Sequence, residues 1–222
     1  MATPFLELVL RFIKNNGLKM SELSNQLKKL VIASGNAGKI EEFRAYLADL
    51  GVTLVAKPDS IDVEETGVTF IENAHLKASQ VAIATKEWAI ADDSGLEVIA
   101  LNGAPGVLSA RYAETDLDRI NRILKELGDH PNREAQFVCA IAIAAPDGKI
   151  TADAIGICKG IIADMPRGNA GFGYDPIFLV PDLQQTFGEI APEVKSRISH
   201  RANALAILRS KLESLVAPHY SA

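Results

Sequence analysis

The sequence has few cysteines, few aromatic residues and no excess of positive charge, and each shortage excludes a class of protein. Two cysteines among 222 residues cannot form the disulfide framework of a small secreted domain. Cys139 and Cys158 lie in apolar, strand-like segments, so we expect reduced core thiols and a cytoplasmic protein. With aromatic residues at 6% and a formal net charge of −5, the composition gives no reason to expect binding to a nucleic-acid polymer.

Long hydrophobic runs are also missing. No apolar run approaches the roughly 20 residues that a bilayer-spanning helix needs, so no membrane partner is expected. The N-terminal stretch 1–27 is partly apolar, but Glu7 and Arg11 interrupt it, and it lacks the cationic start and small-residue cleavage site of a leader. We therefore predict a helical extension of unknown role at 1–27, or a start-site artefact, followed by one domain at 28–222.

From Lys29 onward, short apolar segments alternate with helix-like patterns, which indicates an α/β fold. The pair Thr69 and Glu72 has the spacing of a capping box, which predicts a helix start. A turn at 145–149, "APDGK", predicts a hairpin between the apolar segments around it. The predicted strands are 29–34, 52–56, 89–95, 135–145 and 150–160, and the predicted helices are 40–50, 69–85, 117–127 and a last one from about Ser199. Because the early strands alternate with helices and the hairpin is antiparallel, we expect a mixed central sheet flanked by helices.

The segment "WAIADDSGLEV", residues 88–98, runs from apolar residues directly into two carboxylates. Neighbouring side chains of a strand point to opposite faces, so Asp92 and Asp93 should have different surroundings. Asp-Ser-Gly is typical of turns, which predicts that the pair lies at the end of a strand. Open α/β sheets bind their ligands at such ends, although an ordinary Asp-rich turn would give the same pattern.

The segment "SGNAGK" follows the first predicted strand and precedes a helix. Glycines, a helix start and a lysine together suit an anion such as phosphate. The segment is not a Walker A loop, because Ala33 replaces its first glycine and Ile40 replaces the hydroxyl residue that holds magnesium. A bound triphosphate would therefore need a metal held by carboxylates elsewhere; the alternative is a plain turn with a solvated lysine. The candidate residues are Ser34, Gly35, Asn36, Ala37, Gly38 and Lys39.

Those carboxylates could come from Asp92 and Asp93 together with the acidic loop "EETG", which carries Glu64 and Glu65. Magnesium prefers hard oxygen ligands and often takes only one or two protein carboxylates. Taken alone, the two glutamates also suit a solvated loop. The residues do not rank Asp92 against Glu65 as a further metal contact.

Two later segments could contact an organic ligand. In "GFGYDP" the glycines would let a flat ring approach the backbone, and Phe172 would offer a stacking surface. The alternative is a tight turn with its rings in the core. In "KSRISHR" two basic residues lie near a helix start, where the helix dipole disfavours them, so they are candidate ligand donors or a solvated basic face. The candidates are Phe172, Gly173, Tyr174, Asp175, Lys195, His200 and Arg201.

Read in order, these segments resemble the inosine triphosphate pyrophosphatase family, the XTP/dITP diphosphatases. The resemblance covers about residues 29–216 and includes "EETGVTFIENAHLKA", "GAPGVLSARYA" and "KSRISHRANAL". It implies a homodimeric, Mg²⁺-dependent enzyme with two lobes and a cleft between them. Such an enzyme hydrolyses ITP, dITP and XTP at the α-phosphorus to the monophosphate and pyrophosphate, which removes deaminated purines from nucleotide pools.

The resemblance also implies roles for individual residues. Glu64 and Asp93 would hold magnesium, and Asp93 would accept the proton of the attacking water. Ser94 and the candidates named above, from Ser34–Lys39 to Arg201, would bind substrate. Donors such as His200 and Arg201 would pair with the 6-oxo group of hypoxanthine or xanthine and be left unpaired by adenine. Lys77, on the same predicted helix face as Asn73, has no assigned role.

Three alternatives remain open at this stage. A related Maf-like enzyme would cleave pyrimidine or modified nucleoside triphosphates by similar chemistry. A nucleotide sensor would bind ITP without releasing pyrophosphate, although the presence of both Glu64 and Asp93 argues against it. An acidic protein-interaction module would have no affinity for nucleotides.

Overall fold

The computed structural model describes residues 27–216. The predicted extension at residues 1–27 lies outside this range except for Leu27. Seven strands form one sheet in the order β2-β1-β3-β4-β5-β6-β7. The strands are β1 (Lys29–Ile32), β2 (Thr53–Ala56), β3 (Trp88–Val98), β4 (Glu134–Ala144), β5 (Ile150–Ile162), β6 (Phe178–Val180) and β7 (Gln185–Thr186). Strand β1 pairs in parallel with β2 and β3, and every later pairing is antiparallel. The predicted mixed sheet is confirmed.

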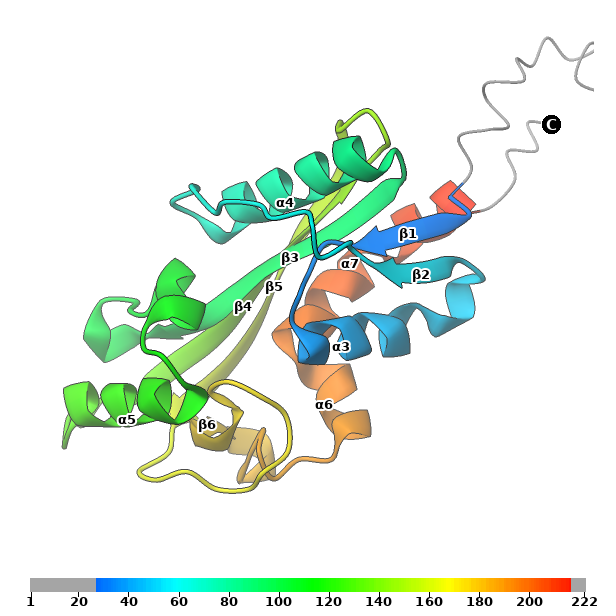
Figure 1. Cartoon of the computed structure of the whole chain (residues 1–222). Coiled ribbons are helices and arrows are strands. Elements are labelled where there is room, and N and C mark those ends of the chain that lie inside the picture. Colours follow the sequence, from blue (N-terminus) through cyan, green and yellow to red (C-terminus); the bar gives the residue numbers. More distant parts are fainter. Residues whose placement is uncertain (1–26, 217–222) are drawn as a thin grey trace, which may run out of the picture.

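Helices cover both faces of this sheet (Figure 1). Helix α4 lies on one face, while α3 and α7 lie on the other. The helices are α3 (Ala37–Leu47), α4 (Phe70–Thr85), α5 (Asp116–Leu127), α6 (Pro192–Ile198) and α7 (His200–Val216), with 3-10 turns η1 (Ala48–Leu50), η2 (Ile99–Leu101), η3 (Gly106–Arg111), η4 (Asp175–Ile177) and η5 (Pro181–Leu183). The short helix α6 was not predicted. No helix within residues 27–216 is long and apolar enough to cross a membrane.

Local sequence explains several helix ends. The side chain of Asn36 accepts a hydrogen bond from the backbone N–H of Lys39 and caps α3. Thr69 and Glu72 form both hydrogen bonds of the predicted capping box, so α4 begins as expected. At the end of the first helical segment Gly51 takes φ +69°, which a glycine adopts without steric cost.

Strand β3 contradicts one prediction. Its strand structure does not end at Asp92–Asp93 but continues through both residues to Val98. Antiparallel pairing with β4 runs without interruption from Ala89 to Val98. A ladder of backbone hydrogen bonds on the β4 side thus overrides the local turn preference of Asp-Ser-Gly. The strand that ends here is β1, which pairs with β3 only at Trp88–Ile90.

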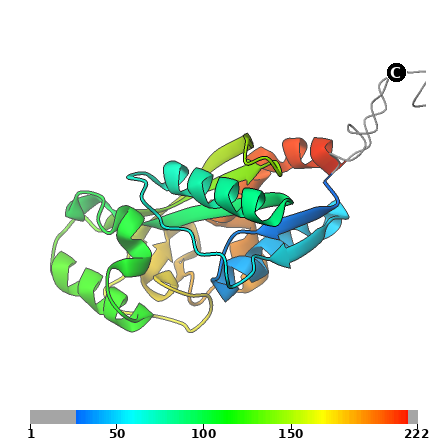
Figure 2. The same ribbon diagram turned by 45° about the horizontal axis from the view of Figure 1, so that its top comes forward.

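The long strands β3, β4 and β5 join two halves of the molecule (Figures 1 and 2). At one end, two buried clusters lie on opposite faces of the sheet, one beneath α4 and one beneath α3 and α7. At the other end, a third cluster packs α5, η4 and the ends of β4 and β5 together. Leu27, at the start of the described range, is 1% exposed and belongs to the α3–α7 cluster.

The predicted hairpin is formed by β4 and β5, with Gly148 at φ +87° in its turn. Cys139 and Cys158 are both free and buried, which confirms the predicted reduced core thiols. Burial raises the pKa of Cys139 to about 12 and that of Cys158 to about 11, so neither is a thiolate at neutral pH.

Candidate active site

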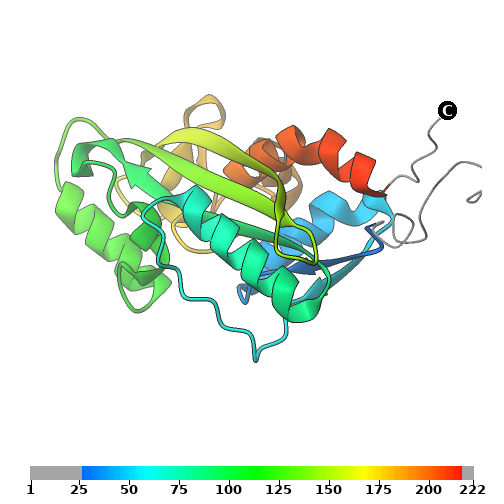
Figure 3. The ribbon, with the colours of Figure 1, turned by 90° about the horizontal axis from the view of Figure 1, so that it is seen from above.

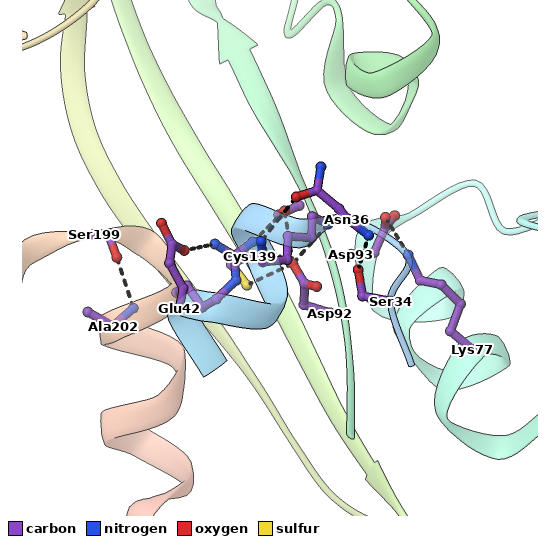
Figure 4. Close-up of polar contacts among 12 residues, drawn as sticks. Ser34, Asn36, Glu42, Lys77, Asp92, Asp93, Cys139, Ser199 and Ala202 are labelled. Carbon is purple, nitrogen blue, oxygen red and sulfur yellow. Dashed lines mark hydrogen bonds and ion pairs between the residues drawn. The ribbon is translucent and has the colours of Figure 1, made fainter. Parts of the chain in front are cut away.

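Successive residues of β3 place two carboxylates on opposite faces of the sheet, just past the point where β1 ends (Figure 4). Asp92 is 1% exposed and Asp93 is 6% exposed. The prediction that the two side chains have different surroundings is confirmed. This position also agrees with the general rule that ligands of α/β sheets lie at the carboxyl ends of parallel strands.

Asp92 faces α3 and α7 and is held by two cations. Its Oδ2 lies 2.6 Å from Nη2 of Arg201 and 3.0 Å from Nζ of Lys39. The hydroxyl of Ser94 donates to the same oxygen at 3.0 Å. Burial alone would raise the pKa of Asp92, but the Arg201 and Lys39 cations hold it well below its usual range. Asp92 is therefore a fixed anion that fits a structural role.

Glu42, one turn after Lys39 on α3, links Arg201 to a second cation. It pairs with Nη1 of Arg201 and lies 3.0 Å from Nζ of Lys195. Lys195 is also 2.6 Å from Oδ2 of Asp175. Asp175 is 2% exposed and Lys195 is 6% exposed. Burial raises the pKa of Asp175, and the ammonium of Lys195 offsets only part of that effect.

Asp93 faces α4, which supplies two of its partners. Asn73 donates to Oδ2 at 3.1 Å, and Nζ of Lys77 lies 3.0 Å from Oδ1. Burial raises the pKa of Asp93, and Lys77 and Lys39 only partly counteract it. Burial would lower the pKa of Lys77, but Asp93 and Asp92 raise it. The carboxyl of Asp93 is therefore a better proton acceptor than a solvated aspartate.

The acidic loop before α4 also contacts Lys77. Oε1 of Glu65 lies 2.6 Å from Nζ of Lys77, and Oε2 lies 3.1 Å from Nη2 of Arg111 on η3. Glu64 is exposed and makes no ion pair with any residue that the structure describes. Within residues 27–216 no group of three or more His, Cys, Asp or Glu side chains is placed to hold a metal ion.

The predicted phosphate loop runs beside Asp92. Residues 35–37 are exposed, and the hydroxyl of Ser34 accepts a hydrogen bond from the N–H of Asn36 at 3.1 Å. A Cβ on Gly38 would lie 2.5 Å from Cδ1 of Phe172. The ring of Phe172 thus rests on the backbone of α3, and two segments far apart in the sequence meet at Gly38.

The loop that carries Phe172 is fixed from several directions. Asp175 accepts a hydrogen bond from the N–H of Phe172 at 2.8 Å, and Asp116 of α5 accepts one from the N–H of Gly173 at 2.9 Å. Tyr174 is 4% exposed, and its hydroxyl donates to the carbonyl of Ser109 at 2.9 Å. Of the two rings, Tyr174 lies in the core, while Phe172 is half-buried at the edge of the site.

His200 begins α7 and stacks on Phe137, with 4.7 Å between ring centroids. It is 5% exposed, and its Nδ1 has no hydrogen-bond partner among the described residues. Burial lowers the pKa of His200 well below its usual value, and the Arg201 and Lys195 cations lower it further. The imidazole is therefore neutral at pH 7 and carries one N–H donor.

The structure brings together most of the predicted site residues, although they come from segments far apart in the chain. Lys39, Asp92, Ser94, Arg201, Lys195 and Asp175 share one network, and Asp93 lies on the opposite face of the same strand. The structure adds Glu42, Asn73 and Arg111, which were given no role from the sequence, and gives Lys77 two partners. Spacing could have found two of them, because Glu42 follows Lys39 by three residues and Asn73 precedes Lys77 by four.

Arg201 differs from the expectation of an available donor. It is 0% exposed, and its Nη atoms are paired with Asp92, Glu42 and Ser94. A buried cation is tolerated at this helix start because two carboxylates neutralise its charge.

Comparisons with known proteins concern the family and the fold of the chain and not its individual site residues. A family model described as the Ham1 family matches residues 30–211. A dITP/XTP pyrophosphatase of Nostoc sp. is 58% identical over 189 residues, which cover 85% of this chain and 96% of that protein. The dITP/XTP pyrophosphatase of Synechocystis sp. is 55% identical over 175 residues, which cover 79% of this chain and 90% of that protein.

Solved structures show the same fold. The Ham1 protein of Staphylococcus aureus superposes with a TM-score of 0.75 at 47% identity and covers 84% of this chain and 99% of its own. A HAM1 protein of Coxiella burnetii gives a TM-score of 0.77 at 43% identity and covers 84% and 98%. The resemblance inferred from the motifs is confirmed, and the chain belongs to the Ham1 family.

Proposed function

We propose that this protein is a nucleoside-triphosphate pyrophosphatase that hydrolyses dITP, XTP and ITP to the monophosphate and pyrophosphate. Its relatives from Nostoc and Synechocystis carry the name dITP/XTP pyrophosphatase at 58% and 55% identity. The structural observation that carries the proposal is the position of Asp93, a buried carboxyl with a raised pKa beside Lys77, close to the end of β1.

In the proposed reaction, water attacks the α-phosphorus and the bond from that phosphorus to the bridging oxygen of pyrophosphate breaks. Asp93 accepts the proton of the attacking water. Lys39 and Lys77 lie next to the two carboxylates of β3, at 3.0 Å in both cases, and their charge would stabilise the departing pyrophosphate. The backbone of Ser34–Lys39 would bind the triphosphate at the start of α3.

The residues that would hold Mg²⁺ are Glu64 and Asp93. The donors fit this ion, because both are hard carboxylate oxygens and Glu64 has no ion-pair partner in the described chain. The neighbouring carboxylates already share one cation, since Lys77 lies 3.0 Å from Asp93 and 2.6 Å from Glu65. Magnesium needs only one or two protein carboxylates, so a larger cluster is not required. When bound, the ion would supply charge neutralisation for the polyphosphate.

The purine base would lie on the opposite side of β3. Phe172 supplies a ring face at the rim of the site, and Asp175 holds the backbone of that loop at 2.8 Å. His200 supplies a neutral, buried imidazole whose Nδ1 has no partner in the described residues. A donor of this kind would pair with a 6-oxo group and be left unpaired by the amino group of adenine. The substrate contacts on this side of β3 would also include Ser94, Lys195 and Arg201.

Two further proposals come from the family resemblance. The protein would act as a homodimer, and it would work in the cytoplasm, where purine nucleotide pools are used. Neither proposal rests on the arrangement of the site.

A substrate panel tests the activity. Pyrophosphate release would be measured with ITP, XTP, GTP, ATP and dTTP, with Mg²⁺ and after removal of divalent ions by EDTA. We expect turnover of ITP and XTP well above that of ATP and dTTP, and loss of turnover without Mg²⁺. Faster release from dTTP than from ITP would point to the pyrimidine-cleaving alternative, and tight ITP binding without release would indicate a sensor.

A further inference from the structure

The backbone around Phe172 needs support from outside its own loop. Both neighbours of Phe172 are glycines with positive φ, +73° at Gly171 and +62° at Gly173. Glycine adopts this region without steric cost, but it also loses more conformational freedom than any other residue when the chain is ordered. The position of the Phe172 ring therefore depends on the groups that hold these two peptide units in place.

Two carboxylates hold the N–H groups on either side of the Phe172 Cα. Asp175 accepts the N–H of Phe172 at 2.8 Å, and Asp116 accepts the N–H of Gly173 at 2.9 Å. Asp175 belongs to the same loop, whereas Asp116 precedes Gly173 by 57 residues and begins α5. Helix α5 and this loop lie side by side at one end of the molecule (Figure 3). Asp116 thus ties the loop to a separate element.

The carboxylate of Asp116 is itself held in place. Its Oδ1 pairs with Nη1 of Arg119, and its Oδ2 is the atom that accepts the N–H of Gly173. Arg119 also donates to two backbone carbonyls just before the helix. The start of α5 is fixed by a capping box between Thr115 and Asp118, and the buried face of the helix packs in the third cluster. A carboxylate held in this way can position the loop, because it has little freedom to follow the loop.

The two hydrogen bonds together set the direction of the Phe172 side chain. A peptide unit is planar, so a bond to its N–H restrains the whole unit. Asp175 restrains the unit before the Phe172 Cα, and Asp116 restrains the unit after it. The ring that they aim lies 4.8 Å from Nζ of Lys195 and rests on the backbone of α3. Loss of either bond would free one of the two units.

We propose that Asp116 is a positioning residue for recognition of the purine base. By holding the N–H of Gly173, it keeps the ring of Phe172 where the base stacks. This proposal rests on the proposed function, which assigns Phe172 to the base. Asp116 touches no reacting atom and acts only through the loop, so it contributes to substrate binding and not to the chemical step at Asp93.

Two substitutions of Asp116 separate this role from a simple effect on the helix. Asp116→Ala removes a charge-assisted hydrogen bond and should raise the KM for ITP about tenfold, while kcat changes less than about twofold because only binding is affected. Asp116→Asn keeps an oxygen that can accept the N–H of Gly173, so its KM should lie close to that of the wild type. If Asp116 acted only through its charge at the start of α5, the two variants would be equally impaired, which would overturn the proposal.

Hydrogen–deuterium exchange of the full chain measures the loop without relying on activity. The peptide that spans residues 168–175 should exchange faster in D116A than in the wild type and at the wild-type rate in D116N. Leu117→Ala, at a residue 62% exposed in the same helical turn, is the matched control and should change neither exchange nor KM. Equal exchange in D116A and the wild type, or an unchanged KM in D116A, would overturn the proposal. Absence of pyrophosphate release from the wild type would instead count against the proposed activity.

Discussion

Lys77 and Asp93 form a buried ion pair with 3.0 Å between Nζ and Oδ1, and yet the pKa of Asp93 is raised above its usual value. Burial outweighs the adjacent positive charge. An aspartate in this state is both more basic than usual and held in place, since Asn73 donates to its other oxygen at 3.1 Å. These are the properties that a proton acceptor at a buried site needs.

Replacement of this carboxyl should stop the reaction. We expect Asp93→Asn to lower kcat for pyrophosphate release from ITP by roughly 100-fold or more, because a general base typically contributes that much. The amide keeps the shape of the side chain, so ITP binding measured by calorimetry should largely survive. Asp164→Asn, at an exposed residue, is the matched control. Wild-type turnover in D93N would show that Asp93 is not the base.

Loss of the partner cation should change the pH dependence of the activity. Lys77 lowers the pKa of Asp93 against the effect of burial, so in Lys77→Met that pKa should rise further. A base works only when deprotonated. The fall of kcat/KM toward acid pH should therefore begin at a higher pH in the variant than in the wild type.

The control for this profile is Lys29→Met, which removes a half-exposed lysine whose Nζ lies 3.3 Å from Glu87. Its kcat/KM profile should follow that of the wild type between pH 5 and pH 9. If the acid side of the kcat/KM profile of K77M coincides with that of the wild type, Lys77 does not affect the titration of Asp93.

Arg201 should matter for stability as well as for substrate choice. Arg201→Ala leaves the buried Asp92 with Lys39 as its remaining cation and the half-buried Glu42 with Lys195. The loss of the buried cation that joins them should lower the free energy of unfolding by up to about 3–5 kcal/mol. Urea denaturation measures this change. Replacing Asp92 by Asn in the same chain should remove part of the loss, because a buried charge that has lost its nearer cation disappears. Arg209→Ala, which breaks a pair with Asp49 at 2.8 Å on the surface, should lower the free energy of unfolding far less, because solvent screens an exposed pair.

The same variant tests base recognition. If Arg201 orients Ser94 and the loop around it, R201A should narrow the ratio of kcat/KM for ITP over ATP. An unchanged ratio in a folded R201A sample would assign the discrimination to other residues.

His200 should make the folded state sensitive to mild acid. Its pKa in the folded protein lies well below the usual value, chiefly because of burial, whereas the unfolded chain binds a proton near pH 6.5. Below that pH the unfolded state takes up a proton that the folded state does not, so the free energy of unfolding falls as the pH falls, by about 1.4 kcal/mol per pH unit at most. Above pH 7 both states are neutral at this residue and the contribution is constant.

His200→Gln should flatten the part of this dependence between pH 6.5 and pH 5, measured by urea denaturation at each pH. His130→Gln, at an exposed histidine, should leave the slope as it is in the wild type. Equal slopes for H200Q and the wild type would mean that His200 is not kept neutral by folding.

The contact between Gly38 and Phe172 predicts that Gly38→Ala has opposite effects on stability with and without the ring of Phe172. Gly38→Ala would place a Cβ 2.5 Å from Cδ1 of Phe172, so it should displace the ring and raise the KM for ITP. In a Phe172→Ala background the clash is gone. There the same substitution should stabilise the protein by roughly 0.5–1 kcal/mol, because alanine is favoured over glycine within a helix. A destabilising effect of equal size in both backgrounds would contradict the contact.

Much of the fold could be predicted because its signals are local. The capping box of Thr69 and Glu72 uses residues three apart, the β4–β5 turn has its own residue preferences, and the strands β1 and β4 are runs of apolar residues. The error at Asp92–Asp93 has the opposite cause. Turn chemistry is local, but the pairing of β3 with β4 and the neutralising charge of Arg201 come from more distant parts of the chain.

The sequence was enough to predict which segments form the site. It was not enough to predict which side chains pair with one another. Residue types indicated that Lys39, Asp93, Phe172 and His200 carry chemistry. Nothing local indicated that Arg201 would be fully enclosed between Asp92 and Glu42, or that Arg111 would reach Glu65. Such pairs depend on how α3, α7 and η3 pack around the sheet.

The unbroken course of β3 has a mechanical consequence. Asp92 and Asp93 are neighbouring residues of one continuous antiparallel ladder with β4, so the backbone positions that carry the two carboxylates stay fixed relative to each other. Any adjustment to a passing nucleotide must therefore come from the helices and loops on either side, while the strand serves as the stationary reference against which they move.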